Sequence, residues 1–306
     1  MKITSLIIVL FSTLSSFSQP ASFHDSCNTV LWGVVNSKGD TSYILGTCHI
    51  VGNTFVDGYA PINSKYRQAN CIVGESIDNS FFAQKSNWFK TLPAKDQRLI
   101  KNYLRQTTPS FYLMSDRKIP PSFLYYLMLG EMAVRECHTY NENDVCDMDT
   151  YLINGATTLN KKVYGLEQRN NLFDTAVFSQ IGVRSDKEAI VKIKDFVVNN
   201  DRYKDTVHKW CNCNEMNDYL NLKINYRFSK SSIEEDSANA IVCDQRNDRW
   251  MSGLKTIIDS NRAFIAVGIG HLYYNKGLIM QLANSGYTPF PVTMHNTGPV
   301  KYRKKY

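Results

Sequence analysis

After its first twenty residues, this chain of 306 residues has no apolar run long enough to cross a bilayer. It also lacks low-complexity tracts and repeats of fixed period, which argues against a disordered chain or a solenoid. No stretch rich in Pro, Gly or Ser marks a linker between domains. Hydrophobic residues make up 43% and charged residues 21%, so the chain can bury an ordinary globular core. We therefore expect one folded domain without a stable membrane span.

The N-terminus has the parts of a secretory signal peptide. Lys2 supplies the basic start, residues 3–11 are apolar, and small polar residues lead to a cleavage site after Ser18. The apolar part is too short for a permanent anchor, although an uncleaved anchor is the alternative. We predict a signal peptide at residues 1–18 and an exported protein that is periplasmic or secreted.

The basic charge excess is modest and partly terminal. The formal net charge of +7 falls to +6 when Lys2 leaves with the signal peptide, and four basic residues lie in the segment KYRKKY at 301–306. A basic tail can bind nucleic acid or an anionic membrane, but on an exported protein it more often serves solubility. We expect no nucleic-acid partner.

All eight cysteines follow the signal peptide, and their even number suits an oxidising compartment. Cys48 and Cys71 lie within apolar runs and are predicted to be buried thiols. The other six are predicted disulfide candidates: Cys27, Cys137, Cys146, Cys211, Cys213 and Cys243. The pair Cys211-x-Cys213 could also bind a metal, but no second Cys/His pair has zinc-site spacing, which favours disulfides.

Short β-branched and aromatic runs alternate with amphipathic stretches along the chain. The strands predicted from these runs lie at 29–35, 41–46, 70–75, 161–167, 263–268 and 287–292. The helices predicted from apolar residues at three- and four-residue spacing lie at 93–106, 121–137, 147–160, 186–200, 237–260 and 278–286. Gly39 and Asp40 favour a tight hairpin between the first two strands.

This order of elements predicts an α/β (mixed α+β) fold. We expect one domain over residues 19–306, with a central mixed β-sheet flanked by helices and a helical insertion at about residues 80–145. The final strand–helix–strand unit has the form of a βαβ crossover, which favours parallel pairing of its two strands.

Four strand-like runs end alike, with a glycine shortly before a residue that can bind a metal or a proton. YILGTCH ends at His49, CIVGE at Glu75, VYGLE at Glu167 and FIAVGIGH at His271. Ligands of open α/β sheets bind beyond the carboxyl ends of the strands, where glycine permits tight turns. If these strands are neighbours, two imidazoles and two carboxylates converge on one crevice.

Such a set suits a divalent metal. Imidazole and carboxylate ligate zinc, manganese, cobalt or iron, and a catalytic site keeps one position open for water. The metal lowers the pKa of that water towards ~7, while a glutamate that is not a ligand moves the proton. One histidine at a strand end is usually structural, but two in the same context with two glutamates favour a functional site.

The same stretches resemble the TraB/GumN family, which includes the Tiki metalloproteases and is related to erythromycin-esterase-like and ChaN-like proteins. The resemblance covers nearly the whole chain after the signal peptide, in the family's order. Its matching segments are LWGVVNSKGDTSYILGTCHIVG, IVGESI, VYGLEQ, QRNDRW and AFIAVGIGHLYYNKGLIMQLANSGYTPFPV. The last segment is the most specific, and the helical middle is not diagnostic.

The resemblance implies a metal-dependent hydrolytic site built on two Gly-x-x-His motifs, with Gly46, Gly268 and Gly270 as structural glycines. On this basis we predict three ligands for manganese, cobalt or zinc: His49, His271 and Glu75. Cys48, next to His49, could bind the metal as well, but its burial is favoured.

The remaining predicted site residues have chemical or positional roles. Glu167 is predicted as the general base. The resemblance, in which Arg246 and Asn247 match the family's Arg-Asn pair, favours Arg246 as an electrostatic clamp, with a salt bridge to Asp244 or Asp248 as the alternative. Asn247 and Tyr273 are predicted to contact substrate, although Tyr273 could equally pack in the core.

Asp149 is predicted to be a favourable charge at a helix N-terminus rather than a catalytic acid. The other four histidines lie in polar stretches without a periodic pattern and are predicted to be surface residues: His24, His138, His208 and His295.

The predicted function is that of an exported metal-dependent hydrolase, peptidase-like, with a peptide or small molecule as its substrate. Two alternatives remain open. One is a protein of the same fold that binds a peptide or signal without cutting it. The other is an esterase or amidase that acts on a non-peptide substrate.

Overall fold

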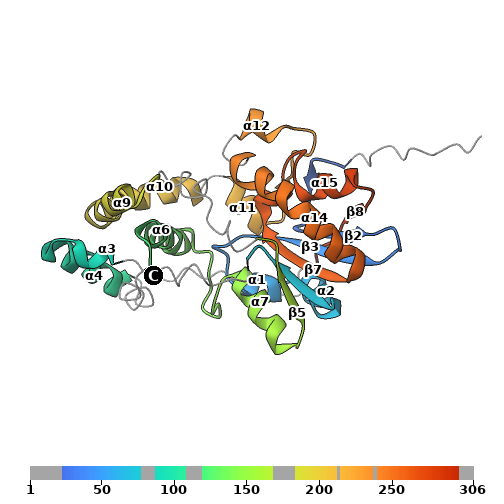
Figure 1. Ribbon diagram of the computed structural model, residues 1–306, viewed down its shortest axis with the longest axis horizontal. Coiled ribbons are helices and arrows are strands. Elements are labelled where there is room, and N and C mark those ends of the chain that lie inside the picture. Colours follow the sequence, from blue (N-terminus) through green and yellow to red (C-terminus); the bar gives the residue numbers. More distant parts are fainter. Residues whose placement is uncertain are drawn as a thin grey trace, which may run out of the picture.

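The computed structural model describes residues 23–76, 87–107, 119–167, 183–211, 214–236 and 240–295 (Figure 1). The predicted signal peptide and the basic tail lie outside these ranges. Within them, the main sheet has six strands in the order β5-β4-β7-β3-β2-β8. These strands are β2 (Leu31–Val35), β3 (Thr41–Thr47), β4 (Cys71–Gly74), β5 (Lys162–Gly165), β7 (Ala263–Gly268) and β8 (Thr288–Pro291). The predicted mixed α/β architecture is confirmed.

Helices lie between most of these strands along the chain. The α-helices are α1 (Thr54–Asp57), α2 (Ala60–Gln68), α3 (Trp88–Thr91), α4 (Ala94–Thr107), α6 (Pro121–Cys137), α7 (Met148–Thr158), α9 (Asp186–Val198), α10 (Asn200–Cys211), α11 (Asn214–Leu220), α12 (Ser232–Glu235), α14 (Gln245–Ser260) and α15 (Leu278–Asn284). A π-helical turn, η2 (Ala240–Asp244), leads into α14, and a 3-10 turn, η3 (Ile269–Leu272), follows β7. Two short strands, β1 (Ser26–Cys27) and β6 (Ile224–Asn225), form a separate small sheet.

The sheet combines a hairpin with four parallel strands. β2 and β3 pair antiparallel across the predicted turn, where Gly39 has a φ of 85° that favours glycine. β3 then pairs parallel with β7, β7 with β4, and β4 with β5. The carboxyl ends of these four strands therefore meet at one edge of the sheet.

The last strand does not pair as predicted. β8 pairs antiparallel with β2 at the edge of the sheet, so β3 and β2 separate it from β7. The two strands of the closing unit do point the same way, but the predicted pairing between them is wrong. Pro289 and Pro291 have no N–H to donate, which suits a strand with only one neighbour.

The buried side chains form two hydrophobic clusters. The first lies around the sheet and includes residues of α2, α7, α14 and α15, such as Tyr66, Leu152, Leu254 and Leu282. The second joins α3, α4, α6 and α9, which together with the adjoining α10 we call the helical lobe. Figure 1 shows these helices gathered on the left, beside the sheet.

The helical lobe is larger than the predicted insertion. Residues 80–145 supply α3, α4 and α6, but α9 and α10 come from beyond residue 183 and complete its core. Phe196 of α9 is fully buried there against Tyr103 and Tyr125. Within the described ranges, none of the helices combines the length and the apolarity needed to cross a bilayer.

Candidate functional site

The four predicted residues follow four strands, and these strands are parallel neighbours in the sheet, which meets the condition set by the sequence analysis. His49 comes two residues after β3, Glu75 directly after β4, Glu167 two residues after β5, and His271 three residues after β7. The Glu75 carboxylate lies at the centre of this group. Its Oε1 is 3.8 Å from Nε2 of His49 and 3.5 Å from Nε2 of His271. Two histidines more than two hundred residues apart thus face one oxygen atom.

The glycines explain why both motifs have the form Gly-x-x-His. A Cβ atom on Gly46 would lie 2.3 Å from Cδ1 of Ile269 and 3.0 Å from Cδ1 of Leu272, in the turn that carries His271. A Cβ atom on Gly268 would lie 3.3 Å from Nε2 of His49 and 3.2 Å from Oε1 of Glu75. The glycine of each motif therefore leaves room for side chains that belong to the other. Gly270 lies within η3 itself.

Asn247 determines the tautomer of His271. Its Nδ2 donates to two backbone carbonyl oxygens, of His271 and of Lys276, both at 3.1 Å. Its Oδ1 can therefore only accept, and Nδ1–H of His271 donates a hydrogen bond of 2.7 Å to it. The lone pair of neutral His271 is consequently on Nε2, the atom that faces Glu75.

Asp149 performs the same task for His49 with a carboxylate in place of an amide. Its Oδ2 lies 2.8 Å from Nδ1 of His49, and its Oδ1 accepts a hydrogen bond of 2.7 Å from the buried Thr47 hydroxyl. The Asp149 charge raises the pKa of His49 well above its usual value. His49 thereby also presents Nε2 towards Glu75.

Asp149 is the site residue that the sequence reasoning missed. It does lie in the first turn of α7, as predicted, but its side chain contacts the end of β3. The sequence separation of one hundred residues hides this contact. The sequence did offer one signal, which is that a second acid, Asp147, lies two residues earlier. In the structure Asp147 caps the helix by accepting from Thr150 N, which leaves Asp149 for another contact.

Arg246 joins three of the predicted residues. Its guanidinium donates to Glu75 Oε2 at 2.7 Å, to Glu167 Oε1 at 2.5 Å and to Nε2 of His271 at 3.1 Å. Trp250 stacks beneath it, with the ring centroid 4.5 Å from Cζ of Arg246 and 4.3 Å from the His271 ring. These partners of Arg246 differ from the alternative prediction, a salt bridge to Asp244 or Asp248 nearby in the chain.

The two aspartates considered for that local bridge contact other groups. Asp244 is buried and bonds the Ser232 hydroxyl. Asp248 accepts from Gln281 and lies 3.8 Å from Lys276 Nζ. Arg246 is consequently a link between strand ends rather than a surface group of its own helix.

The buried charges of the site balance one another. Burial alone would raise the pKa of Glu75, but the charges of Arg246 and His49, together with the Gly268 N–H at 2.7 Å, hold it well below its usual value. Burial lowers the pKa of His271 to about 3, so this ring is neutral at physiological pH. The permanent charge of Arg246 is therefore the one that keeps Glu75 ionised.

Three other predicted residues lie deeper or further away than expected. Glu167 has only 4% of its side chain exposed and is paired with Arg246. Asn247 is fully buried, so its amide contacts His271 and not an open cavity. Tyr273 packs against the rings of Tyr226 and Tyr274, which agrees with the alternative prediction that it packs in the core.

The cysteines differ from prediction. Three of the six disulfide candidates are free thiols in the structure: Cys27, Cys146 and Cys243. Cys71 is a buried free thiol as predicted, and Cys48 is a half-buried one whose pKa burial raises to about 11. Cys137 is not among the free thiols, and the side chains of Cys211 and Cys213 lie outside the described residues, so disulfide formation by these three candidates stays a prediction.

The donor atoms at the strand ends are of the kinds that a divalent metal binds. Nε2 of neutral His271 carries a lone pair, and Nε2 of His49 would carry one once a metal displaced its proton. Their distances of 3.5 and 3.8 Å from Oε1 of Glu75 are near the about 3.4 Å that separates two donors bound tetrahedrally to one zinc. Among the described residues, however, no group of three or more His, Cys, Asp or Glu side chains is placed so as to hold a metal ion. The cation that contacts Glu75 is the Arg246 guanidinium.

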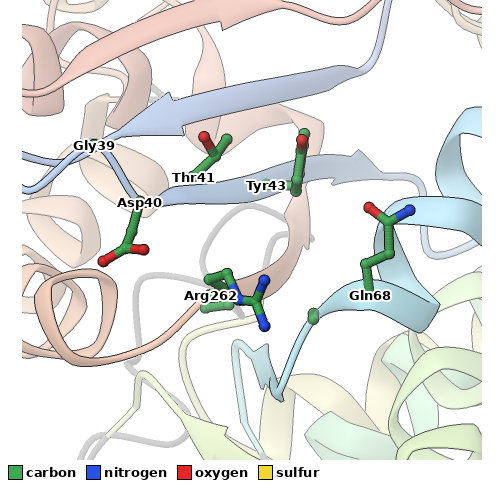
Figure 2. Close-up of a pocket in the computed structure, with 8 residues that line it drawn as sticks. Gly39, Asp40, Thr41, Tyr43, Gln68 and Arg262 are labelled. Carbon is green, nitrogen blue, oxygen red and sulfur yellow. The ribbon is translucent and has the colours of Figure 1, made fainter.

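A cavity of about 200 Å³ opens beside His49 at the carboxyl ends of β4 and β7. Its walls are His49, Gly74, Glu75, Ser76, Asp149, Ile153 and Ala266. A larger cavity of about 300 Å³ lies at the opposite ends of β3 and β7, between Asp40, Tyr43, Gln68 and Arg262 (Figure 2). We take the smaller one as the candidate site, because the paired histidines and carboxylates are there and sheets of this kind bind ligands at that edge.

Comparison with known families agrees with this geometry. A model of the TraB/PrgY/gumN family matches residues 30–291, which include all four strand ends and the helix of Arg246. Neither the curated proteins nor the solved structures contain a significant match to the chain. Because the family model covers most of its length, the chain belongs to the TraB/PrgY/gumN family.

Proposed function

We propose that this protein is an exported metal-dependent hydrolase that cleaves peptide bonds. One observation carries the proposal: the Nε2 atoms of His49 and His271 face the same Glu75 oxygen at the wall of a cavity. Each imidazole also has its other nitrogen held by a hydrogen-bond acceptor, which is typical of histidines that bind metals. Family membership supports a shared fold and leaves the reaction to be tested.

In this proposal His49, His271 and Glu75 hold manganese, cobalt or zinc. Such a metal would lower the pKa of a bound water towards ~7 and polarise a carbonyl group. Asp149 and Asn247 hold the two rings in the tautomer that presents Nε2. Arg246 supplies a fixed positive charge that can stabilise a developing oxyanion.

The two glutamates have different access to the cavity. Glu75 lines it, whereas Glu167 is buried and paired with Arg246. A general base must come within hydrogen-bond reach of the proton it removes. We therefore propose that Glu167, predicted as the base, chiefly anchors Arg246, and that Glu75 is the glutamate within reach of a water in the cavity.

Metal content and peptide cleavage test the proposal together. Purified protein is analysed for bound elements and assayed on a peptide panel with added manganese, cobalt or zinc. The proposal expects one metal per chain and cleavage, both lost in His49→Ala and kept in His295→Ala, a matched change at an exposed histidine. A wild-type protein without metal or turnover, and equal to His49→Ala in both assays, would contradict it.

Glutamine substitutions separate the roles of the two glutamates. Glu75→Gln is expected to abolish turnover, whereas Glu167→Gln is expected to reduce it mainly by loosening Arg246. Equal turnover in Glu75→Gln and the wild type would show that Glu75 neither binds the metal nor accepts the proton.

A second candidate function is peptide binding without cleavage. The observation that favours it is the ion pair between Arg246 and Glu75, which already neutralises the carboxylate that a metal would use. Saturable binding of peptides without turnover at any added metal would support this function. Turnover of ester or lactone substrates in place of peptides would instead identify an esterase.

A further inference from the structure

The cavity beside His49 has two different walls. One wall is polar and consists of His49, Glu75, Ser76 and Asp149, of which all but Ser76 are placed at the proposed reaction centre. The other wall is apolar and consists of Gly74, Ala266 and the side chain of Ile153 from α7. A ligand in this cavity would therefore present its reacting group to one wall and a hydrocarbon group to the other.

The volume limits what can enter. Cavities that enclose a drug-sized ligand measure roughly 300–1,000 Å³. The cavity of about 200 Å³ is smaller, and it holds the space of roughly six or seven water molecules. It thus matches a single small side chain with the adjoining backbone rather than a complete ligand.

Gly74 and Ile153 determine this volume together. A Cβ atom at position 74 would lie 2.8 Å from Cδ1 of Ile153, so any larger residue there would fill the cavity or push Ile153 aside. Ile153 is only half buried, which means that it can be shortened without opening the main core.

The charges of the polar wall are already paired. Glu75 bonds Arg246 at 2.7 Å, and Asp149 bonds His49 at 2.8 Å. A basic side chain in the cavity would have to compete with these partners, and an acidic one would meet two carboxylates. The cavity therefore favours an uncharged group.

We infer that this cavity is the side-chain subsite of the enzyme, that it selects a small apolar residue next to the bond that is cut, and that Ile153 sets the size limit. The inference rests on the proposed hydrolase function, because it takes the polar wall as the reaction centre. Ile153 is a specificity-determining residue here and takes no part in the chemistry.

The test compares substrates that differ in one side chain. Wild type, Ile153→Ala and Leu159→Ala are assayed on capped peptides that carry Ala, Val, Leu or Phe at one position. Leu159 is the matched control, because it is a large apolar residue at the end of α7 that does not line the cavity. The wild type and Leu159→Ala are expected to prefer Ala and Val, whereas Ile153→Ala shifts the kcat/KM ratio towards Leu or Phe by about tenfold or more.

Binding distinguishes the failure of this inference from failure of the hydrolase proposal. If no peptide is cut, the same four peptides are titrated against the proteins and followed by calorimetry. Tighter binding of the Ala and Val peptides by the wild type, with a shift towards Leu and Phe only in Ile153→Ala, would keep the subsite although the hydrolase fails. A preference that is unchanged by Ile153→Ala, whether measured in cleavage or in binding, overturns the subsite.

Discussion

The two Gly-x-x-His motifs have the same form in the sequence and different surroundings in the fold. His49 has half of its side chain exposed and contacts the carboxylate of Asp149. His271 is 3% exposed, lies against Trp250 and contacts the amide of Asn247. The His49 ring therefore lines the cavity, whereas the His271 ring is buried and is not among the residues that line it.

The difference teaches that a hydrogen-bond partner sets what an imidazole can do. The Asp149 carboxylate favours the charged form of His49, whereas the neutral Asn247 amide and burial favour the neutral form of His271. A short motif predicts that a histidine follows the end of a strand. Its protonation depends on residues from other elements, here α7 and α14.

Alanine at each histidine gives the largest expected contrast between the motifs. His271→Ala removes a buried ring and leaves the Asn247 oxygen unpaired, so it should lower the free energy of unfolding by about 2–4 kcal/mol. His49→Ala removes a half-exposed ring and should lower it by under about 1 kcal/mol. Urea unfolding of the metal-free proteins measures both values. Equal losses would mean that the two rings are not differently buried.

The second largest expected contrast is between the glycines Gly46 and Gly268. Substitution of the first should mainly lower stability, and substitution of the second should mainly weaken metal binding. Gly46→Ala places a Cβ atom 2.3 Å from Ile269 and is expected to cost about 1–3 kcal/mol of stability. Gly268→Ala meets Glu75 and His49 at 3.2 and 3.3 Å, so a small shift relieves it and less stability is lost. That shift should nevertheless weaken metal binding more than Gly46→Ala does. Thermal unfolding measures the stability of the two variants, and metal titration measures their affinity. A larger loss of stability in Gly268→Ala, or a larger loss of affinity in Gly46→Ala, would contradict this prediction.

The smallest expected effect is that the contributions of His49 and His271 to stability change in opposite directions with pH. The folded pKa of His49 is raised, so its contribution to stability is complete below the unfolded value of about 6.5 and is lost as the pH rises through the folded pKa. The folded pKa of His271 is lowered to about 3, so its contribution is complete above about 6.5 and is lost as the pH falls. Unfolding of wild type, His49→Gln and His271→Gln, with a chelator present, tests both directions. The same pH trend in both variants would contradict the assigned environments.

Much of the site could be predicted because it follows from short, local patterns. Each of the four strand ends combines an apolar run with a glycine and a reactive residue, and such runs form neighbouring strands of one sheet. Asp149 was missed because its contact with His49 spans one hundred residues. The burial of Glu167 was missed for a similar reason, because it depends on Arg246 from another helix.

The fold shows the same division. The hairpin at Gly39 and the helices at α4, α6, α7 and α9 agree with their predicted positions within a few residues. The position of β8 beside β2, and the completion of the helical lobe by α9 and α10, were not predicted. Both depend on which surfaces meet after the local elements have formed.

The sequence by itself determined the secondary structure near the site, the two motifs and the family, because apolar periodicity and glycine act over a few neighbouring residues. Only the tertiary structure decided that His49 is paired with a carboxylate and His271 with an amide, and that Arg246 bridges Glu75 and Glu167. These contacts join residues from different elements, and burial among them sets which groups are charged.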